Sequence, residues 1–175
     1  GYKALTGDSD VVALIASVLE RWDCAGTLDD ALVLWNMIEV DDDAIEVVKS
    51  IRRLGFTVCL ASNQDSYRGN YMSENLGFRE LFDREYCSFK IGHAKPDEAY
   101  FTHILNDLGI RPAQAVFIDD RPENIEAASN QHFVNTLSST RRISRKQNPA
   151  IKFFEKIDDS SCWILVTCLN PYCRW

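Results

Sequence analysis

The sequence lacks the features of a membrane-spanning or disulfide-rich secreted chain. The longest apolar run of the C-terminal tail, CWILVTCL (162–169), is far shorter than the roughly 20 residues that a membrane span needs. The first ten residues, GYKALTGDSD, show no charged segment followed by an apolar one, so no secretion signal is expected. The six cysteines form no C-x-x-C pair and the histidines do not cluster, which argues against a disulfide framework or a zinc site. We therefore expect no membrane association and a reducing, cytoplasmic compartment.

An excess of positive charge is also missing. The formal net charge is −7, whereas nucleic acids select surfaces that are net positive. Nucleic acid is therefore not an expected partner. The 175 residues suffice for one domain with a substantial core, or for one domain with a small appendage. The sequence does not indicate the oligomeric state.

The spacing of apolar residues indicates helices that alternate with buried strands. Predicted helices cover 8–22, 27–39, 42–54, 66–76, 96–108 and a segment that begins at Pro122. Asp8 or Ser9 can cap the first helix, and Thr27 with Asp30 resembles a capping box. Short, nearly all-apolar runs predict strands at 56–62, 86–89 and 115–119. This alternation predicts an α/β fold with a Rossmann-like, three-layer parallel sheet.

Three polar segments follow the predicted strands or precede a helix. Ser62 and Asn63 end the first strand, Lys95 precedes the helix at 96–108, and Asp119 with Asp120 end the strand at 115–119. Ligands of such sheets bind at the carboxyl ends of the strands, so these side chains are expected to converge on one crevice.

The converging groups are those that phosphoryl transfer requires. A hydroxyl with a neighbouring backbone amide binds an anionic oxygen, and a lysine ammonium neutralises a phosphate. Two carboxylates with a substrate phosphate commonly hold Mg²⁺, which also removes the repulsion within an aspartate pair. Each element alone has an ordinary structural interpretation. Ser62 can be a turn residue, Lys-Pro-Asp a helix entry, and Asp119-Asp120 a helix cap that pairs with Arg121.

The order of four sequence segments resembles the haloacid dehalogenase (HAD) superfamily, three of whose motifs match in order. The segments are ASNQ, LGFRELFD, S-x-x-I-G-x-x-KPDEAYF and VFIDDRPENIEAA, and the resemblance covers roughly residues 40–130. The sequence is most similar to the phosphatase-like subfamily with a helical cap. This resemblance implies a partial cap at 1–45, a HAD-like core at 46–140 and an atypical tail at 141–175.

The resemblance also implies roles for single residues. Ser62 matches the phosphate-binding hydroxyl of the second motif, next to Asn63, and Lys95 matches the lysine of the third. Asp120 matches the direct Mg²⁺ ligand of the fourth motif, with Asp119 behind it and Asn124 in support.

By this resemblance the leading functional prediction is Mg²⁺-dependent hydrolysis of a small phosphorylated metabolite through an aspartyl-phosphate. The acidic pair favours a phosphatase over a 2-haloacid dehalogenase, which needs no metal and stays the third alternative. The second alternative is an inactive fragment or pseudoenzyme that only binds Mg²⁺ and phosphate.

The first motif of the family, a buried strand that ends in D-x-D, is not evident. A D-x-D occurs at Asp8-Ser9-Asp10, which follows YKALTG, a poor buried strand. Asp8 is therefore a weak candidate for the nucleophile and a better candidate for a helix cap. The missing strand is central in the family's fold, and we hypothesise that the apolar segment 162–169 fills its place.

Overall fold

The computed structural model describes residues 2–133, 135–138 and 163–166. Its strands form one five-stranded parallel sheet in the order β2-β1-β5-β3-β4. Their bounds are β1 Thr57–Ser62, β2 Arg84–Cys87, β3 Ala115–Asp119, β4 Asn135–Ser138 and β5 Trp163–Val166. The predicted α/β fold with a Rossmann-like sheet is confirmed.

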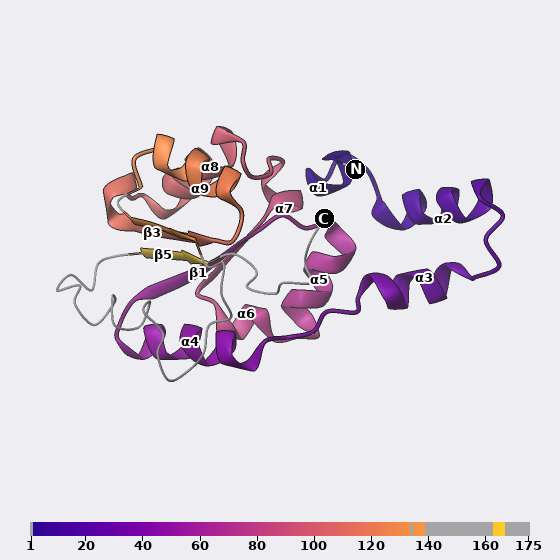
Figure 1. Cartoon of the computed structure of the whole chain (residues 1–175), viewed down its shortest axis with the longest axis horizontal. Coiled ribbons are helices and arrows are strands. Elements are labelled where there is room, and N and C mark those ends of the chain that lie inside the picture. Colours follow the sequence, from indigo (N-terminus) through magenta and orange to yellow (C-terminus); the bar gives the residue numbers. More distant parts are fainter. Residues whose placement is uncertain (1, 134, 139–162, 167–175) are drawn as a thin grey trace.

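Helices cover both faces of the sheet, as Figure 1 shows. The helices on one face are α4 (Asp42–Arg53), α5 (Ser66–Glu74) and α6 (Phe78–Leu81). The opposite face carries α8 (Glu98–Leu108) and α9 (Pro122–Asn130). The short elements α7 (Ser88–Ile91) and η1 (Pro112–Gln114) complete the connections. The sheet is therefore the middle of three layers.

Alternating side chains of the strands supply two separate apolar layers. Val58 and Leu60 pack with α4 and α6, while Cys59 and Ala61 face α8 and α9. All four are at most 1% exposed, as expected for a strand that is covered on both faces. The continuous apolar run at 56–62 thus formed β1 as predicted.

The strand β5 lies at the centre of the sheet. Leu165 pairs in register with Cys59 of β1 on one side and with Phe117 of β3 on the other. The hypothesis that the late apolar segment fills the central position is confirmed for residues 163–166. Without β5, the facing edges of β1 and β3 would leave backbone hydrogen-bonding groups unpaired inside the core.

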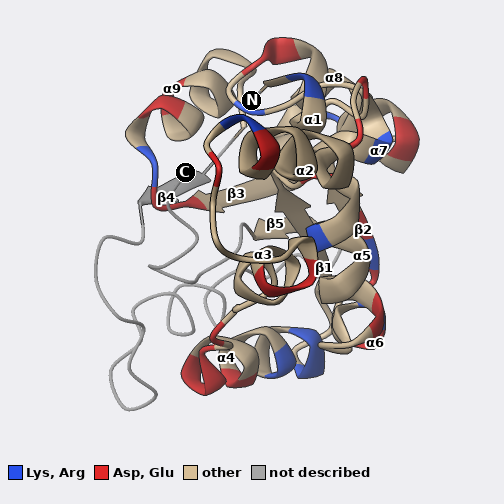
Figure 2. Cartoon of the chain, turned by 90° about the vertical axis from the view of Figure 1, so that its right-hand side faces the viewer, with Lys and Arg blue, Asp and Glu red and all other residues tan. Residues whose placement is uncertain are grey.

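Three N-terminal helices lie beyond the carboxyl ends of the strands, and Figure 2 views them from that side. They are α1 (Tyr2–Leu5), α2 (Val11–Arg21) and α3 (Leu28–Trp35). The predicted capping box of α3 is confirmed, because Asp30 N donates to Thr27 Oγ1 at 3.1 Å and Thr27 N donates to Asp30 Oδ2 at 3.0 Å. The turn after α1 needs Gly7, whose φ is +78° and whose added Cβ would lie 2.6 Å from the carbonyl oxygen of Phe89.

Several predicted element ends were wrong by a few residues. The N-cap of α2 is Asp10, which accepts from Val12 N at 2.9 Å, and not Asp8 or Ser9. The helix predicted to begin at Pro96 begins at Glu98, because Asp97 accepts from Ala99 N at 3.0 Å and caps it. The helix predicted over 27–39 ends at Trp35, and the strand predicted over 86–89 ends at Cys87.

The predicted division into cap, core and tail stays a prediction, although residues 163–166 of the predicted tail lie in the sheet. No helix in the described part of the chain has the length and apolar character to cross a membrane. The described cysteines, Cys24, Cys59 and Cys87, carry free thiols. The remaining cysteines, at 162, 168 and 173, lie outside the described residues.

Candidate functional site

A buried ion pair joins two of the predicted site residues at the carboxyl ends of the strands. Lys95 Nζ donates to Asp119 Oδ2 at 2.9 Å and to the carbonyl oxygen of Ala61 at 2.6 Å. The side chains of Lys95 and Asp119 are only 4% and 1% exposed. The contact therefore links the end of β1, one residue before Ser62, with the end of β3.

The carboxylate of Asp119 is held by several donors. Its Oδ1 accepts from the backbone N of Arg121 at 2.8 Å, and its Oδ2 accepts from Asn124 Nδ2 at 2.8 Å as well as from Lys95. Asn124 is itself 3% exposed. Because both oxygens already accept hydrogen bonds, Asp119 fixes Lys95 and the start of α9 in place.

Asp120, the second aspartate, is exposed where its neighbour is buried. Its pKa is raised above the ordinary value, first by desolvation and then by the negative charge of Asp119. A cation bound beside the pair would relieve this repulsion. Of the two carboxylates, Asp120 is the one that a ligand from solvent can reach.

The donor set fits a magnesium ion that is only partly held by protein. Among the described residues, no group of three or more His, Cys, Asp and Glu side chains is arranged to hold a metal. Mg²⁺ nevertheless needs only one or two carboxylates when substrate phosphate and water complete its shell. Asp120, backed by Asp119, meets that requirement, whereas the described residues do not fit a metal held by protein ligands alone.

Two hydrogen bonds of Asn63, the Asn63 clamp, hold the end of β1 against the loop that contains Lys95. Asn63 Nδ2 donates to the carbonyl oxygen of Lys95 at 2.8 Å, and Lys95 N donates to Asn63 Oδ1 at 2.9 Å. Ser62, 3% exposed, accepts from Gln64 Nε2 at 3.1 Å. The structure thus brings Ser62, Asn63 and Lys95 together, in contact with the cluster around Asp119.

Asn63→Ala is expected to lower the free energy of unfolding by about 1–2 kcal/mol, because two hydrogen bonds to the backbone of Lys95 are lost. Urea unfolding followed by circular dichroism measures the change. The matched control is Asn75→Ala at an exposed position at the end of α5, where the expected change is below about 0.5 kcal/mol. Equal effects of the two substitutions would contradict the clamp.

Two contributors to this region were missed by the sequence analysis. Ser88 Oγ accepts from Gln64 N at 3.0 Å and donates to Gln64 O at 3.1 Å, which fixes the loop after Ser62. Trp35 Nε1 donates to Asp65 Oδ2 at 2.9 Å and ties α3 to the same loop. Gln64 was detectable as part of the strand-end motif, but nothing in the sequence indicated contacts between segments 24 to 30 residues apart.

The weak nucleophile candidate Asp8 lies in the turn between α1 and α2. It is exposed and accepts from Thr6 Oγ1 at 2.7 Å. The residues before it form α1, not the buried strand that the family's first motif requires. The prediction that Asp8 is a weak candidate for the nucleophile stays a prediction.

A cysteine nucleophile is also disfavoured at this edge of the sheet. Cys87 pairs in register with Ser62, but it is only 1% exposed. Burial raises the pKa of the Cys87 thiol to about 12, so the thiol is neutral near pH 7.

Comparison with known proteins assigns the family. A family model described as haloacid dehalogenase-like hydrolase matches residues 5–132. The chain belongs to the haloacid dehalogenase-like hydrolases. The resemblance carried by the strand-end motifs is therefore confirmed. The matched range includes α2, α3 and the strands β1, β2 and β3, while β4 and β5 lie beyond it.

Three similar proteins illustrate the relationship. The D-ribitol-5-phosphate phosphatase of Bacteroides thetaiotaomicron is 26% identical over 101 residues, which cover 54% of this chain and 48% of that protein. The sesquiterpene phosphatase astK of Aspergillus oryzae is 37% identical over 82 residues, with coverages of 47% and 42%. A HAD family enzyme of B. thetaiotaomicron, solved with magnesium and inorganic phosphate, aligns with a TM-score of 0.68 at 19% identity over 78% of this chain and 72% of that one. The similarity to the solved structure concerns the fold alone. The matched part of this chain spans less than half of the D-ribitol-5-phosphate phosphatase and less than half of astK.

Proposed function

We propose that this HAD-type hydrolase cleaves phosphomonoesters of small metabolites with the help of Mg²⁺. The buried Lys95–Asp119 pair carries the proposal, because it places an ammonium next to Ser62 at the edge where such sheets bind ligands. Lys95 is held by Asp119 and by the Asn63 clamp, so its charge is positioned before a ligand arrives.

Each residue has a distinct part in the proposed site. The Ser62 hydroxyl and the backbone amide of Asn63 would bind phosphate oxygens, and Lys95 would neutralise their negative charge. Asp120, backed by Asp119, would hold the magnesium ion, while Asn124 keeps Asp119 oriented. A magnesium ion held there would supply positive charge beside the phosphoryl oxygens.

The relatives support this chemistry without deciding the substrate. One is named for a polyol phosphate and another for a sesquiterpene, and both are named phosphatases. A structural neighbour was solved with magnesium and inorganic phosphate together. Common to these proteins is phosphate chemistry, so the proposed partner of this chain is a small phosphorylated metabolite. A cytoplasmic location and the absence of a nucleic-acid partner stay predictions.

A second candidate function is phosphate and Mg²⁺ binding without turnover. The family's nucleophile is a carboxylate at the end of the central strand, and covalent catalysis requires that group. The sequence that contains β5, WILVTCLNPYCRW (163–175), has no acidic residue. This observation favours a binding function. The side chains proposed to bind metal and phosphate are the same in both proposals.

Hydrolysis of p-nitrophenyl phosphate in the presence of Mg²⁺ tests the proposed function. For the hydrolase, Asp120→Asn is expected to lower kcat/KM at least about 100-fold, because the exposed carboxylate of the proposed metal site is lost. Glu126→Gln is the matched control, since it neutralises an exposed acid on α9 and is expected to leave the rate within about twofold.

The outcomes separate the candidates. Turnover that disappears with EDTA and in Asp120→Asn supports the hydrolase. Calorimetric binding of inorganic phosphate with Mg²⁺ but no turnover supports the binding function. Halide release from a 2-haloacid without metal would instead support a dehalogenase, and loss of turnover in Asp8→Asn would make Asp8 the nucleophile.

A further inference from the structure

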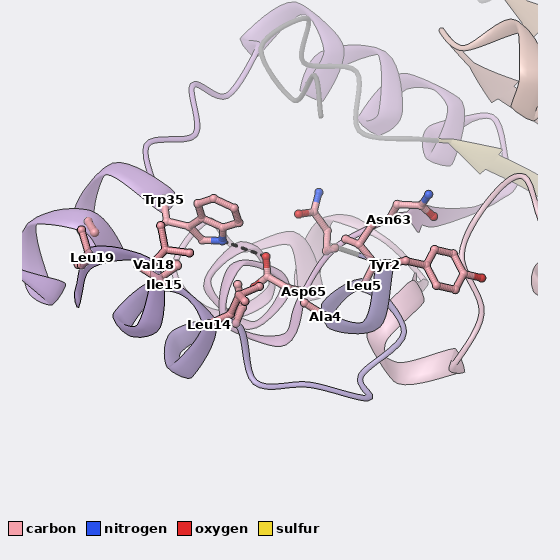
Figure 3. A pocket seen from close by; sticks show the side chains of 13 residues that line it. Tyr2, Ala4, Leu5, Leu14, Ile15, Val18, Leu19, Trp35, Asn63 and Asp65 are labelled. Carbon is pink, nitrogen blue, oxygen red and sulfur yellow. Dashed lines mark hydrogen bonds between the residues drawn. The ribbon is translucent and has the colours of Figure 1, made fainter. Parts of the chain in front are cut away.

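A cavity of about 560 Å³ lies between the N-terminal helices and the loop that follows Ser62 (Figure 3). Its walls come from α1, α2 and α3 on one side and from residues 63–65 on the other. This volume is within the range of about 300–1,000 Å³ that is typical of small-molecule sites. It is therefore large enough for an organic group of substantial size.

The lining of the cavity is almost entirely apolar. Side chains of α2 and α3 dominate it, including Leu14, Ile15, Val18, Leu19 and Trp35. Leu14 and Val18 remain 39% and 36% exposed, so apolar surface is left in contact with solvent. Occupation by a hydrocarbon group would remove that surface from water.

The polar groups at one end of the cavity already have partners. The side-chain amide of Asn63 is hydrogen-bonded to the backbone of Lys95, and Gln64 Nε2 donates to Ser62 Oγ. Asp65 accepts from Trp35 Nε1 at 2.9 Å, drawn in Figure 3, and from Arg68 N at 3.0 Å. A polyol chain placed here would bury hydroxyl groups against apolar walls, which costs free energy unless each hydroxyl finds a partner.

The cavity adjoins the proposed phosphate site at Asn63. This residue lines the cavity, follows Ser62 and is hydrogen-bonded to Lys95 in both directions. A phosphate bound at Ser62 and Lys95 would therefore lie next to the cavity, and its ester group could extend towards the apolar walls of α2 and α3.

We infer that the cavity binds the hydrocarbon part of the substrate, so that the substrate class is phosphate monoesters of apolar alcohols. This inference rests on the proposed function for the position of the phosphate. In the overall reaction a water oxygen forms a bond to phosphorus, the bond from phosphorus to the alcohol oxygen breaks, and the alcohol leaves with a proton that the water supplied. The cavity would select among phosphate monoesters by apolar contact with the alcohol part of the substrate.

The test compares calorimetric binding of n-hexylphosphonate and methylphosphonate in the presence of Mg²⁺. These compounds carry the same headgroup and cannot be hydrolysed, so the measurement does not depend on turnover. Hexylphosphonate is expected to bind at least about tenfold more tightly, because each buried methylene contributes roughly a two- to fourfold gain. Equal affinities would overturn the inference.

A matched pair of variants tests whether the cavity is where the hexyl chain binds. Leu14→Asn, on the cavity wall, is expected to weaken hexylphosphonate binding about three- to tenfold and to change methylphosphonate binding less than about twofold. Leu34→Asn is the control, since Leu34 is an exposed leucine of α3 outside the cavity lining, and both affinities should be retained. Identical effects of the two variants would place the hydrocarbon elsewhere and overturn the assignment.

Turnover separates failure of this inference from failure of the proposed function. Chain-length-dependent binding without phosphate release from n-hexyl phosphate or p-nitrophenyl phosphate would refute the hydrolase and retain the apolar site. If phosphate is released from glycerol 3-phosphate at least as fast as from n-hexyl phosphate, the proposed hydrolase function stands and the apolar substrate class is refuted.

Discussion

Lys95→Met is expected to lower the free energy of unfolding by about 3–5 kcal/mol, because it leaves the charge of Asp119 buried without its ammonium partner. Methionine has a similar length and keeps most of the packing, so the lost free energy of unfolding reports on the missing charge. Hydrogen bonds from Asn124 and from the backbone of Arg121 would remain, but neither donor carries a positive charge. Since small domains are stable by only about 5–15 kcal/mol, the variant would be close to unfolding at ambient temperature.

Two further variants distinguish this explanation from a general loss of lysine. Lys90→Met removes an exposed lysine that is 3.9 Å from Glu85, and its expected cost is below about 1 kcal/mol. The double variant Lys95→Met/Asp119→Asn should regain part of the stability that the single variant lost, since no unpaired charge remains. Urea unfolding of the four proteins gives the comparison, and a loss below about 1 kcal/mol for Lys95→Met would mean that water solvates Asp119.

Leu165→Ala is expected to cost about 2–5 kcal/mol, because Leu165 is completely buried in the central strand β5. Its side chain belongs to the apolar layer beneath α8 and α9, and its backbone is paired on both sides. Removal of its branched end would open a cavity at a position where two neighbouring strands restrict relaxation.

Leu54→Ala provides the control, because Leu54 is 44% exposed and its expected cost is below about 1 kcal/mol. Thermal and urea unfolding of both variants provide the measurement. If Leu165→Ala were as mild as Leu54→Ala, residues 163–166 would not occupy the centre of the sheet, and the site at the ends of β1 and β3 would lose its rigid frame.

The parts of the fold that could be predicted from the sequence are those in which burial alone determines the pattern. The strands at 57–62 and 115–119 are covered on both faces and therefore consist almost wholly of apolar residues. The central place of β5 followed from a vacancy in the resembled fold together with one unassigned apolar run. Strand β4, Asn135–Ser138, was missed because NTLS at the edge of the sheet carries a single large apolar residue.

Element ends were less predictable because neighbouring residues compete for the same role. Asp8, Ser9 and Asp10 are all good caps, and only the geometry of the first turn selects Asp10. Ser88 and Phe89 fit a strand pattern but lie in α7, since β2 ends once it reaches the carboxyl edge. Such choices depend on packing, not on local preference.

In the candidate site, too, some contacts could be predicted from the sequence and others could not. The topology places polar residues at strand ends, so proximity of Lys95 and Asp119 could be expected from their positions alone. The Asn63 clamp and the bond from Trp35 to Asp65 connect segments about 30 residues apart, and they depend on the final packing of loops and helices. The apolar cavity likewise forms only when α2 and α3 meet the loop after β1.

The position of β5 has a consequence for synthesis of the protein on the ribosome. Residues 163–166 emerge after every other described strand, yet they join the pairs β1–β2 and β3–β4 into one sheet. Until then the nascent chain can form only two half-sheets with open edges, which are prone to pair with other chains. Protection of those edges by a chaperone, or rapid completion of translation, would therefore determine how much of the newly made protein reaches the native state.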